Sequence, residues 1–140
     1  MKKIIPIAFV LILLMINCSR RIPGDWDCYE EMNTDMLIKD SLGCAIGMDL
    51  SNNPDTLIDS IGINVVLNHD NPSDLFIWLT HGTDTVLLWD NDFIGETQTI
   101  SVDGLVGKKA NMDWMVYVID EIVNGKEGRL KQVTLMMRYR

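Results

Sequence analysis

The chain has little basic charge. Its 140 residues include 12 Lys and Arg against 20 Asp and Glu, which gives a formal net charge of −8. Residues 1–17 hold two of the lysines and no acidic residue, so the other 123 residues carry 10 basic and 20 acidic side chains, a net charge of −10. Such a segment offers no basic field to a nucleic-acid backbone or to anionic lipid. We therefore expect a protein that binds no nucleic acid.

The sequence also lacks the motifs of common enzymes. It contains two histidines, His69 and His81, and no Gly-x-Ser-x-Gly elbow of a serine hydrolase. No Cys-x-x-Cys pair occurs, so nothing indicates a zinc ribbon or a thioredoxin-type redox site. The length is that of a single domain, with little chain to spare for an elaborate active site. We expect a protein that is not an enzyme, in which His69 caps a strand end; a small hydrolase is the least favoured alternative.

The chain does carry an export signal at its N-terminus. Two lysines open the sequence, and residues 4–16 form an almost wholly apolar run of 13 residues. Because a membrane-spanning helix needs about 20 such residues, this run predicts a signal peptide over residues 1–17. The run stops at Cys18, which resembles the lipobox of bacterial lipoproteins, with Asn17 where a small residue is usual. We expect an exported protein of the bacterial cell envelope, lipid-anchored to a membrane through Cys18; simple secretion is the alternative.

The three cysteines are an odd number, which needs an explanation in an exported protein. If Cys18 carries lipid, Cys28 and Cys44 remain as a pair in an oxidising compartment. A disulfide between them would close a loop and stabilise the fold by about 3 kcal/mol. The alternative is that Cys28 and Cys44 are two independent buried thiols.

Residues 18–40 are interpreted as the lipidated N-terminus followed by a linker. Arginines, a proline and a glycine near its start favour an extended, solvated chain. Met32, Met36 and Leu37 then recur at roughly helical spacing, which indicates one short helix between residues 30 and 40.

Beyond residue 57 the apolar pattern has a period of two, which is typical of strands with one buried face. Clusters of Asn, Asp, Gly and Pro separate the expected strands. We expect these strands at residues 61–67, 75–80, 85–89, 97–102, 113–119 and 130–139. Short strands at regular intervals, without the long helical stretches of an α/β enzyme, predict an all-β antiparallel sandwich over residues 41–140.

Several short motifs occur in this segment in a fixed order. They are a strand ending in His69, an Asp74-Leu75 strand entry, a Gly82-Thr83 turn, the strand Trp114-Met115-Val116-Tyr117-Val118-Ile119-Asp120 and the turn Gly125-Lys126-Glu127-Gly128-Arg129-Leu130. Together they resemble the P domain of the proprotein convertases, the kexin and furin family, over residues 57–139. Ser73 and Val133 stand where that family has a Gly and a late Trp.

The resemblance implies a jelly-roll β-sandwich similar to galactose-binding-like domains, with His69 and Asp74 in the family-motif turn. In the family, the P domain packs beside a subtilisin-type peptidase and supports its folding. Since this chain has no room for the peptidase, the resemblance implies a non-enzymatic, membrane-tethered module that acts through protein–protein contacts on the cell envelope. Its expected partner is an envelope protein, such as a protease or a secreted complex.

Two kinds of ligand also need to be considered. Calcium needs about six to eight oxygen ligands, and Asp74 and Asp120 are the candidates because they stand at positions matched to the family. The alternative is that both are turn formers whose carboxylates bond local backbone amides. A carbohydrate-binding module on the same tether is the rival function, with Trp89, at a strand end, as the candidate stacking residue. Trp78 and Trp114 have apolar neighbours and are expected in the core.

Overall fold

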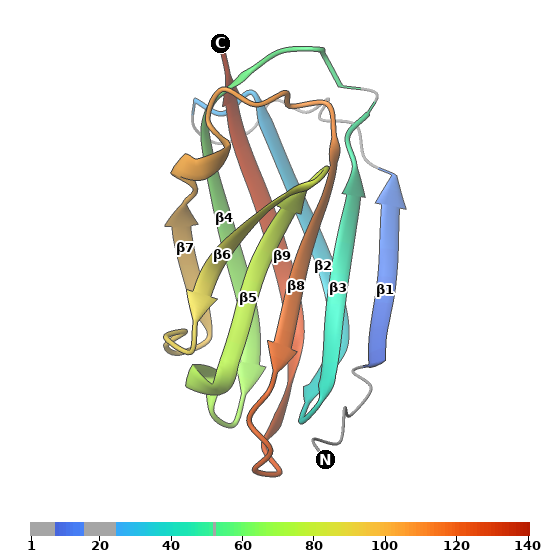
Figure 1. Ribbon diagram of the computed structural model, residues 1–140, viewed down its shortest axis with the longest axis vertical. Coiled ribbons are helices and arrows are strands. Elements are labelled where there is room, and N and C mark those ends of the chain that lie inside the picture. Colours follow the sequence, from blue (N-terminus) through green and yellow to red (C-terminus); the bar gives the residue numbers. More distant parts are fainter. Residues whose placement is uncertain (1–7, 16–24, 52) are drawn as a thin grey trace.

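The fold is that of a computed structural model, which describes residues 8–15, 25–51 and 53–140 (Figure 1). Of residues 8–15 only the backbone is described. The described residues form nine strands and two short 3-10 helices. In chain order these are β1 (Ala8–Met15), β2 (Cys28–Lys39), β3 (Leu42–Asp49), β4 (Ile58–His69), η1 (Pro72–Asp74), β5 (Leu75–His81), β6 (Asp84–Asp90), β7 (Thr97–Ser101), η2 (Asp103–Leu105), β8 (Asp113–Asp120) and β9 (Glu127–Tyr139).

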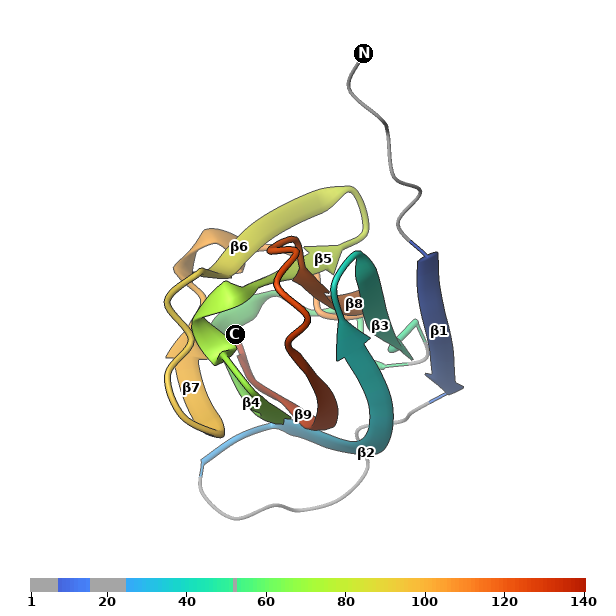
Figure 2. The ribbon, with the colours of Figure 1, turned by 90° about the horizontal axis from the view of Figure 1, so that it is seen from below.

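Strands β2 to β9 form two antiparallel sheets that face each other (Figures 1 and 2). One sheet has the order β6-β5-β8-β3, and the other has the order β2-β9-β4-β7. They are joined at a hairpin, where β2 and β3 form a single residue pair, Lys39 with Leu42. This strand order is that of a jelly roll. The predicted all-β antiparallel jelly-roll sandwich is therefore confirmed.

The core lies between the sheets and is built by the side chains that alternate inward. Ile46 and Met48 of β3, Ile63 and Val65 of β4 and Trp114 of β8 are all fully buried. Burying one such side chain contributes about 1.5–3 kcal/mol. The predicted core position of Trp114 is confirmed.

Strand β2 lies where the sequence predicted a linker. It pairs with β9 along its whole length, from Cys28 opposite Met137 to Lys39 opposite Glu127. The sandwich therefore begins before residue 41, the boundary expected from the sequence.

The helix expected between residues 30 and 40 is wrong, because this segment is part of β2. Met32 and Met36 are buried four residues apart, and Thr34, which alternation places between them, is polar and half-buried. A bulge between Asn33 and Met36 interrupts the pairing as well. Because Thr34 is polar, the apolar residues on the buried side of this strand are four positions apart, which is also the spacing of apolar residues in a helix.

Strands β4 and β9 lie side by side from Ile58 opposite Tyr139 to His69 opposite Gly128. At this last pair, a Cβ added to Gly128 would lie 1.9 Å from the carbonyl oxygen of Asn68. Only glycine permits such a close approach of two backbones. The approach holds the β8–β9 turn against the end of β4.

Strand β1 lies parallel to β3, from Ala8 opposite Leu42 to Met15 opposite Asp49. It falls within the predicted signal peptide, whose removal stays a prediction. Cys18, the predicted lipidation site, lies outside the described residues. No helix in the part of the chain that the structure describes is long and apolar enough to cross a membrane.

The predicted disulfide between Cys28 and Cys44 is wrong. Cys44 is a free thiol buried in the core, whereas Cys28 is disulfide-bonded. The β2–β3 hairpin explains why they do not pair. It sets Cys44 near the turn and Cys28 at the far end of β2, roughly 30 Å away at about 3.3 Å per residue. Bonded cysteines need Cα atoms within about 7 Å of each other.

We expect Cys44 to be the one free thiol of the folded protein. Burial raises the pKa of the Cys44 thiol to about 12, and the thiolate is the reactive form, so Cys44 should resist alkylation at about pH 8 until the protein unfolds. Alkylation with and without denaturant, followed by non-reducing peptide mapping, measures this and identifies the partner of Cys28. Rapid labelling of native Cys44, or recovery of a Cys28–Cys44 peptide, would contradict the structure.

Candidate functional site

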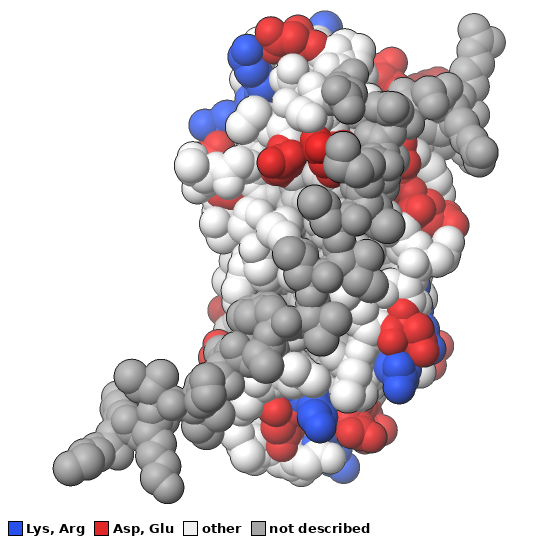
Figure 3. All heavy atoms as spheres, turned by 90° about the vertical axis from the view of Figure 1, so that its right-hand side faces the viewer, with Lys and Arg blue, Asp and Glu red and all other residues white. Residues whose placement is uncertain are grey.

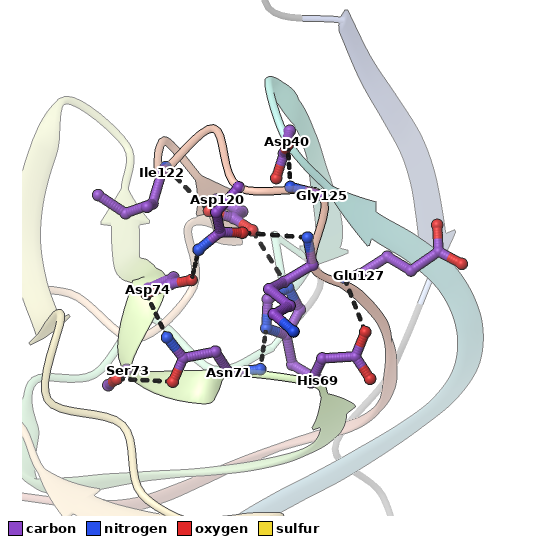
Figure 4. A network of polar contacts seen from close by, with 12 residues as sticks. Asp40, His69, Asn71, Ser73, Asp74, Asp120, Ile122, Gly125 and Glu127 are labelled. Carbon is purple, nitrogen blue, oxygen red and sulfur yellow. Dashed lines mark hydrogen bonds and ion pairs between the residues drawn. The ribbon is translucent and has the colours of Figure 1, made fainter.

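Polar side chains from five segments meet at one end of the sandwich (Figure 4). The segments are the β2–β3 hairpin, the end of β4, η1, the end of β8 and the β8–β9 turn. Strands β4 and β8 belong to opposite sheets and both end here, in turns rich in Asn, Asp, Ser and Gly. We call these residues the polar cluster: Asp40, His69, Asn71, Ser73, Asp74, Asp120 and Asn124.

A buried pair, His69 and Asp120, lies at the centre of the polar cluster. Nε2 of His69 is 3.2 Å from Oδ2 of Asp120, and both side chains are fully buried. The two atoms lie outside hydrogen-bond geometry, so the contact is electrostatic. Nδ1 of His69 accepts the backbone N–H of Asn71 at 3.1 Å. A neutral His69 therefore carries its proton on Nε2, facing Asp120.

The pKa of Asp120 is raised above the ordinary carboxyl value. Burial is the main cause, and the carboxylates of Asp74 and Asp40 act in the same direction, against the backbone N–H of Ile122 and the charge of His69. The folded protein thus holds this proton more firmly than the unfolded chain does. The contribution of Asp120 to stability is greatest at low pH and is lost as pH rises through the raised pKa.

The pair has the groups of an acid–base catalyst but lacks access for a substrate. Oδ1 of Asp120 accepts the backbone N–H of Ile122 at 2.9 Å, and neither His69 nor Asp120 exposes any side-chain surface. A general base must come within hydrogen-bond reach of the proton it removes. The geometry therefore gives the pair a structural role, as expected for His69.

Asp74 connects η1 to the β8–β9 turn. Its Oδ1 accepts the side-chain amide of Asn71 at 2.7 Å, and its Oδ2 accepts that of Asn124 at 2.6 Å. Asp74 is only 7% exposed, whereas Asn71 is half-buried and Asn124 lies on the surface. Oδ2 of Asp40 accepts the backbone N–H of Gly125 at 2.7 Å and holds the same turn from the β2–β3 hairpin.

The candidate calcium ligands Asp74 and Asp120 both lie in the polar cluster, but their carboxylate oxygens already contact other groups of the protein. Each of the four carboxylate oxygens faces a nitrogen of the chain. Among the described residues, no group of three or more His, Cys, Asp or Glu is arranged to hold a metal ion. The arrangement favours the alternative that these aspartates organise turns.

The second histidine, His81, does not join the polar cluster. It ends β5 and is 4% exposed. Its Nε2 lies 2.6 Å from the carbonyl oxygen of Lys109, and its ring packs on Trp114 with centroids 4.4 Å apart. His81 therefore packs a strand end against the core.

Trp89 is not an exposed stacking residue, contrary to the prediction. It is 4% exposed, its indole N–H donates to Oε1 of Gln98 at 2.6 Å, and its ring meets Phe93 edge-on at 5.1 Å. The reason is a bulge in the β5–β6 pairing, where Leu88 is the extra residue. Because of it, Leu88 and Trp89 are both buried, although strict alternation would turn one of them outward.

Trp78 was predicted to lie in the core, but it lies at the surface. It is half-buried and lies on the outward side of β5, between the fully buried Ile77 and Leu79. Its ring stacks on that of Tyr117 of β8, with centroids 5.8 Å apart and planes at 22°. The alternation of Leu75, Ile77 and Leu79 was the sequence signal that could have placed Trp78 outward.

The outward side of the β6-β5-β8-β3 sheet faces the viewer in Figure 1. One row of paired residues crosses it: Leu87 on β6, Trp78 on β5, Tyr117 on β8 and Ala45 on β3. Leu87 is 51% exposed. We give the name aromatic face to the half-buried or exposed apolar residues at the outward positions of this side: Phe76, Trp78, Leu87, Met115 and Tyr117.

The outward side of the other sheet is polar, and several of its charges are paired. Asp35 of β2 contacts Lys131 and Arg129 of β9, and these two cations lower the pKa of Asp35. The side-chain amide of Gln132 donates to that of Asn33 at 2.9 Å. The two outward faces of the sandwich therefore differ in chemistry, and only one of them resembles a contact surface.

Solved structures share this fold. The crystal structure of FLHE matches with a TM-score of 0.62 and 12% identity, over 84% of this chain and 96% of that one. The serine protease of Aeromonas sobria, solved in complex with its chaperone, matches with a TM-score of 0.59 and 14% identity, over 78% of this chain. This chain spans about a quarter of that protease, 26% of its length.

No protein-family model matches the sequence, and no curated protein matches it as a relative. The chain is thus an antiparallel jelly-roll β-sandwich whose fold also occurs within the chain of the Aeromonas sobria serine protease and in FLHE. At 12 and 14% identity, these likenesses show the fold alone.

We expect Asp74→Ala to destabilise the protein in the absence of calcium. The substitution removes the acceptor of two side-chain hydrogen bonds, one from the half-buried Asn71 and one from the exposed Asn124, and each such bond typically contributes about 0.5–1.5 kcal/mol. Asp103→Ala, at an exposed aspartate in η2, is the control and should change the melting temperature little. Thermal unfolding with a chelator and then with calcium measures both variants. A loss seen only with calcium would point to a metal site instead, and an unchanged melting curve would remove Asp74 from either role.

Proposed function

We propose that the protein is a non-enzymatic β-sandwich module that acts through protein–protein contacts in the bacterial cell envelope. The observation that carries the proposal is the aromatic face. Trp and Tyr are enriched among the residues that dominate binding energy at protein interfaces, and large exposed apolar patches are rare on monomeric proteins. Trp78, Tyr117 and the 51%-exposed Leu87 lie in one row on this face.

The fold supports a protease or a secreted complex as the partner. A domain of this fold is part of the Aeromonas sobria serine protease. Three residues of the P-domain-like motifs, His69, Asp74 and Asp120, come together in the polar cluster. In the proposed function the module packs beside its partner as a separate chain. Its net charge of −10 beyond residue 17 steers it toward a basic patch and makes the association sensitive to salt.

The proposed location is the membrane surface, with the lipid on Cys18 as the anchor. Confinement to a membrane raises the effective concentration of the module toward another envelope protein, so weak contacts suffice. The sulfur of Cys18 can carry a lipid or a disulfide but not both. A lipid on Cys18 would leave Cys28 to pair with a cysteine of another chain, because Cys44 is free.

We expect a fatty-acid analogue to label the protein in growing cells and the label to depend on the Cys18 thiol. Cys18→Ala should abolish the label and release the protein from the membrane pellet, whereas Cys44→Ala is the matched control and should leave both unchanged. An unlabelled, soluble wild-type protein, or a mapped Cys18–Cys28 peptide in all of it, would contradict lipid anchoring.

A carbohydrate-binding module on the same tether is the second candidate function. Trp89 no longer supports it, because the indole is buried. The observation that favours it is the near-parallel pair of half-exposed rings, Trp78 and Tyr117, with planes at 22°. Aromatic rings at a protein surface are the groups on which sugar rings stack.

Site-specific cross-linking in intact cells separates the two functions. Benzoylphenylalanine at Leu87, on the aromatic face, should give a discrete protein adduct that Trp78→Ala weakens at least about tenfold, since hot-spot truncation typically costs about 2 kcal/mol. The same probe at Glu31, exposed on the polar face of β2, is the control and should give none. Equal adducts at both positions would contradict the proposal. Glycan binding that Trp78→Ala abolishes, with no adduct at Leu87, would establish the carbohydrate module.

A further inference from the structure

The β6-β5-β8-β3 sheet ends at β3, and a further strand can be added at the outer edge of β3, on the side of β2. Strand β2 pairs with β3 only at Lys39 and Leu42 and then diverges into the other sheet. Beyond that pair, β1 occupies the edge in parallel over eight residues, from Ala8 opposite Leu42 to Met15 opposite Asp49. Figure 2 shows β1 as the outermost strand, next to β3 and outside the two sheets.

The β3 edge lacks the features that keep edge strands from pairing. β2 carries Glu31, Asp35 and Lys39 and a bulge. β6 has an aspartate at each end and a bulge in its pairing, and β7 is a polar strand of five residues. By contrast, the one charged residue of Leu42–Asp49 is Asp49 at its end, the strand has no Pro, and its pairings with β1 and β8 run without a register shift.

The side chains of β3 also suit an added strand. Cys44, Ile46 and Met48 are fully buried in the core and hold the strand in place. The alternate positions are Gly43, Ala45 and Gly47, which crowd neither the edge nor the aromatic face beside it. Figure 3 looks onto this side of the molecule, and the Lys and Arg side chains that it shows lie toward the two ends.

We propose that the β3 edge is a strand-addition site, which takes an extended, uncharged, apolar segment of a partner protein in parallel register once residues 1–17 have been removed. This inference rests on the proposed function, because it names the surface and the kind of partner. The occupant is defined by the segment that pairs there in the full chain, Ala8–Met15, which is eight residues long and has no charged residue and no Pro.

Strand addition is a known mode of peptide recognition with two sources of binding energy. Main-chain hydrogen bonds along the edge give affinity, and pockets for alternate side chains give specificity. A parallel strand presents every second residue's N–H and C=O to its neighbour. Blocking those N–H groups should abolish binding, and blocking the intervening ones should not.

The test uses the protein purified from the envelope after processing, with the unprocessed full chain from the cytoplasm as a control. The probe is a labelled peptide of the Ala8–Met15 sequence with lysines added at both ends for solubility. Two further peptides carry N-methyl groups on one or the other set of alternate residues. We expect the processed protein to bind the unmodified peptide and only one methylated peptide, with at least about a tenfold difference between the two. The full chain, whose edge is occupied, should bind none.

Direction is tested by disulfide trapping on the same proteins. A cysteine at the peptide position of Met15 should trap with Asp49→Cys, its register partner, and not with Leu42→Cys at the other end of β3. Failure of the processed protein to bind, equal binding of both methylated peptides, or trapping with Leu42→Cys would each overturn the proposal. If binding fails while the Leu87 adduct persists, strand addition is wrong and the contact function stands; if both fail, both are wrong.

Discussion

The buried contact between His69 and Asp120 joins the two sheets at one end of the sandwich, since His69 ends β4 and Asp120 ends β8. Removing one partner of a buried ionisable pair typically costs about 3–5 kcal/mol, because the other is left uncompensated. A backbone hydrogen bond also joins strand ends at this point. Ser41 donates its N–H to the carbonyl of Asp120 at 3.0 Å, which holds the β2–β3 hairpin against β8. The ends of β2, β4 and β8 and the start of β3 therefore meet at this contact.

Alternation along the sequence was enough to predict the strands that have one buried face. Ile61, Ile63 and Val65 point inward on β4, as expected from their spacing. Prediction failed where the alternation of buried apolar and outward residues along a strand is interrupted. In β2 the half-buried Thr34 interrupts the apolar residues. In β6 the bulge at Leu88 turns Trp89 into the core, and a bulge depends on pairing with a neighbouring strand, which a single strand's sequence does not contain.

The polar cluster could be predicted only in its local part. His69 and Asp74 belong to one turn, and the motif order identified them together. The contact of His69 with Asp120 depends on which strand ends meet, and this follows from the jelly-roll order and not from any local pattern. The same holds for Asn124, whose bond to Asp74 at 2.6 Å had no signal in the sequence beyond its turn propensity.

The aromatic face and the β3 edge belong to the same sheet, so one partner protein can contact both at once. A strand added to β3 continues the row that runs from Leu87 through Trp78 and Tyr117 to Ala45. Backbone pairing at the edge and aromatic contacts on the face then act on a single partner. Because the buried side chains of β3 fix it from the core side, the edge is preorganised, and binding costs little ordering of the module itself. The polar face, where Asp35 already pairs with Lys131 and Arg129 within the protein, is left to water.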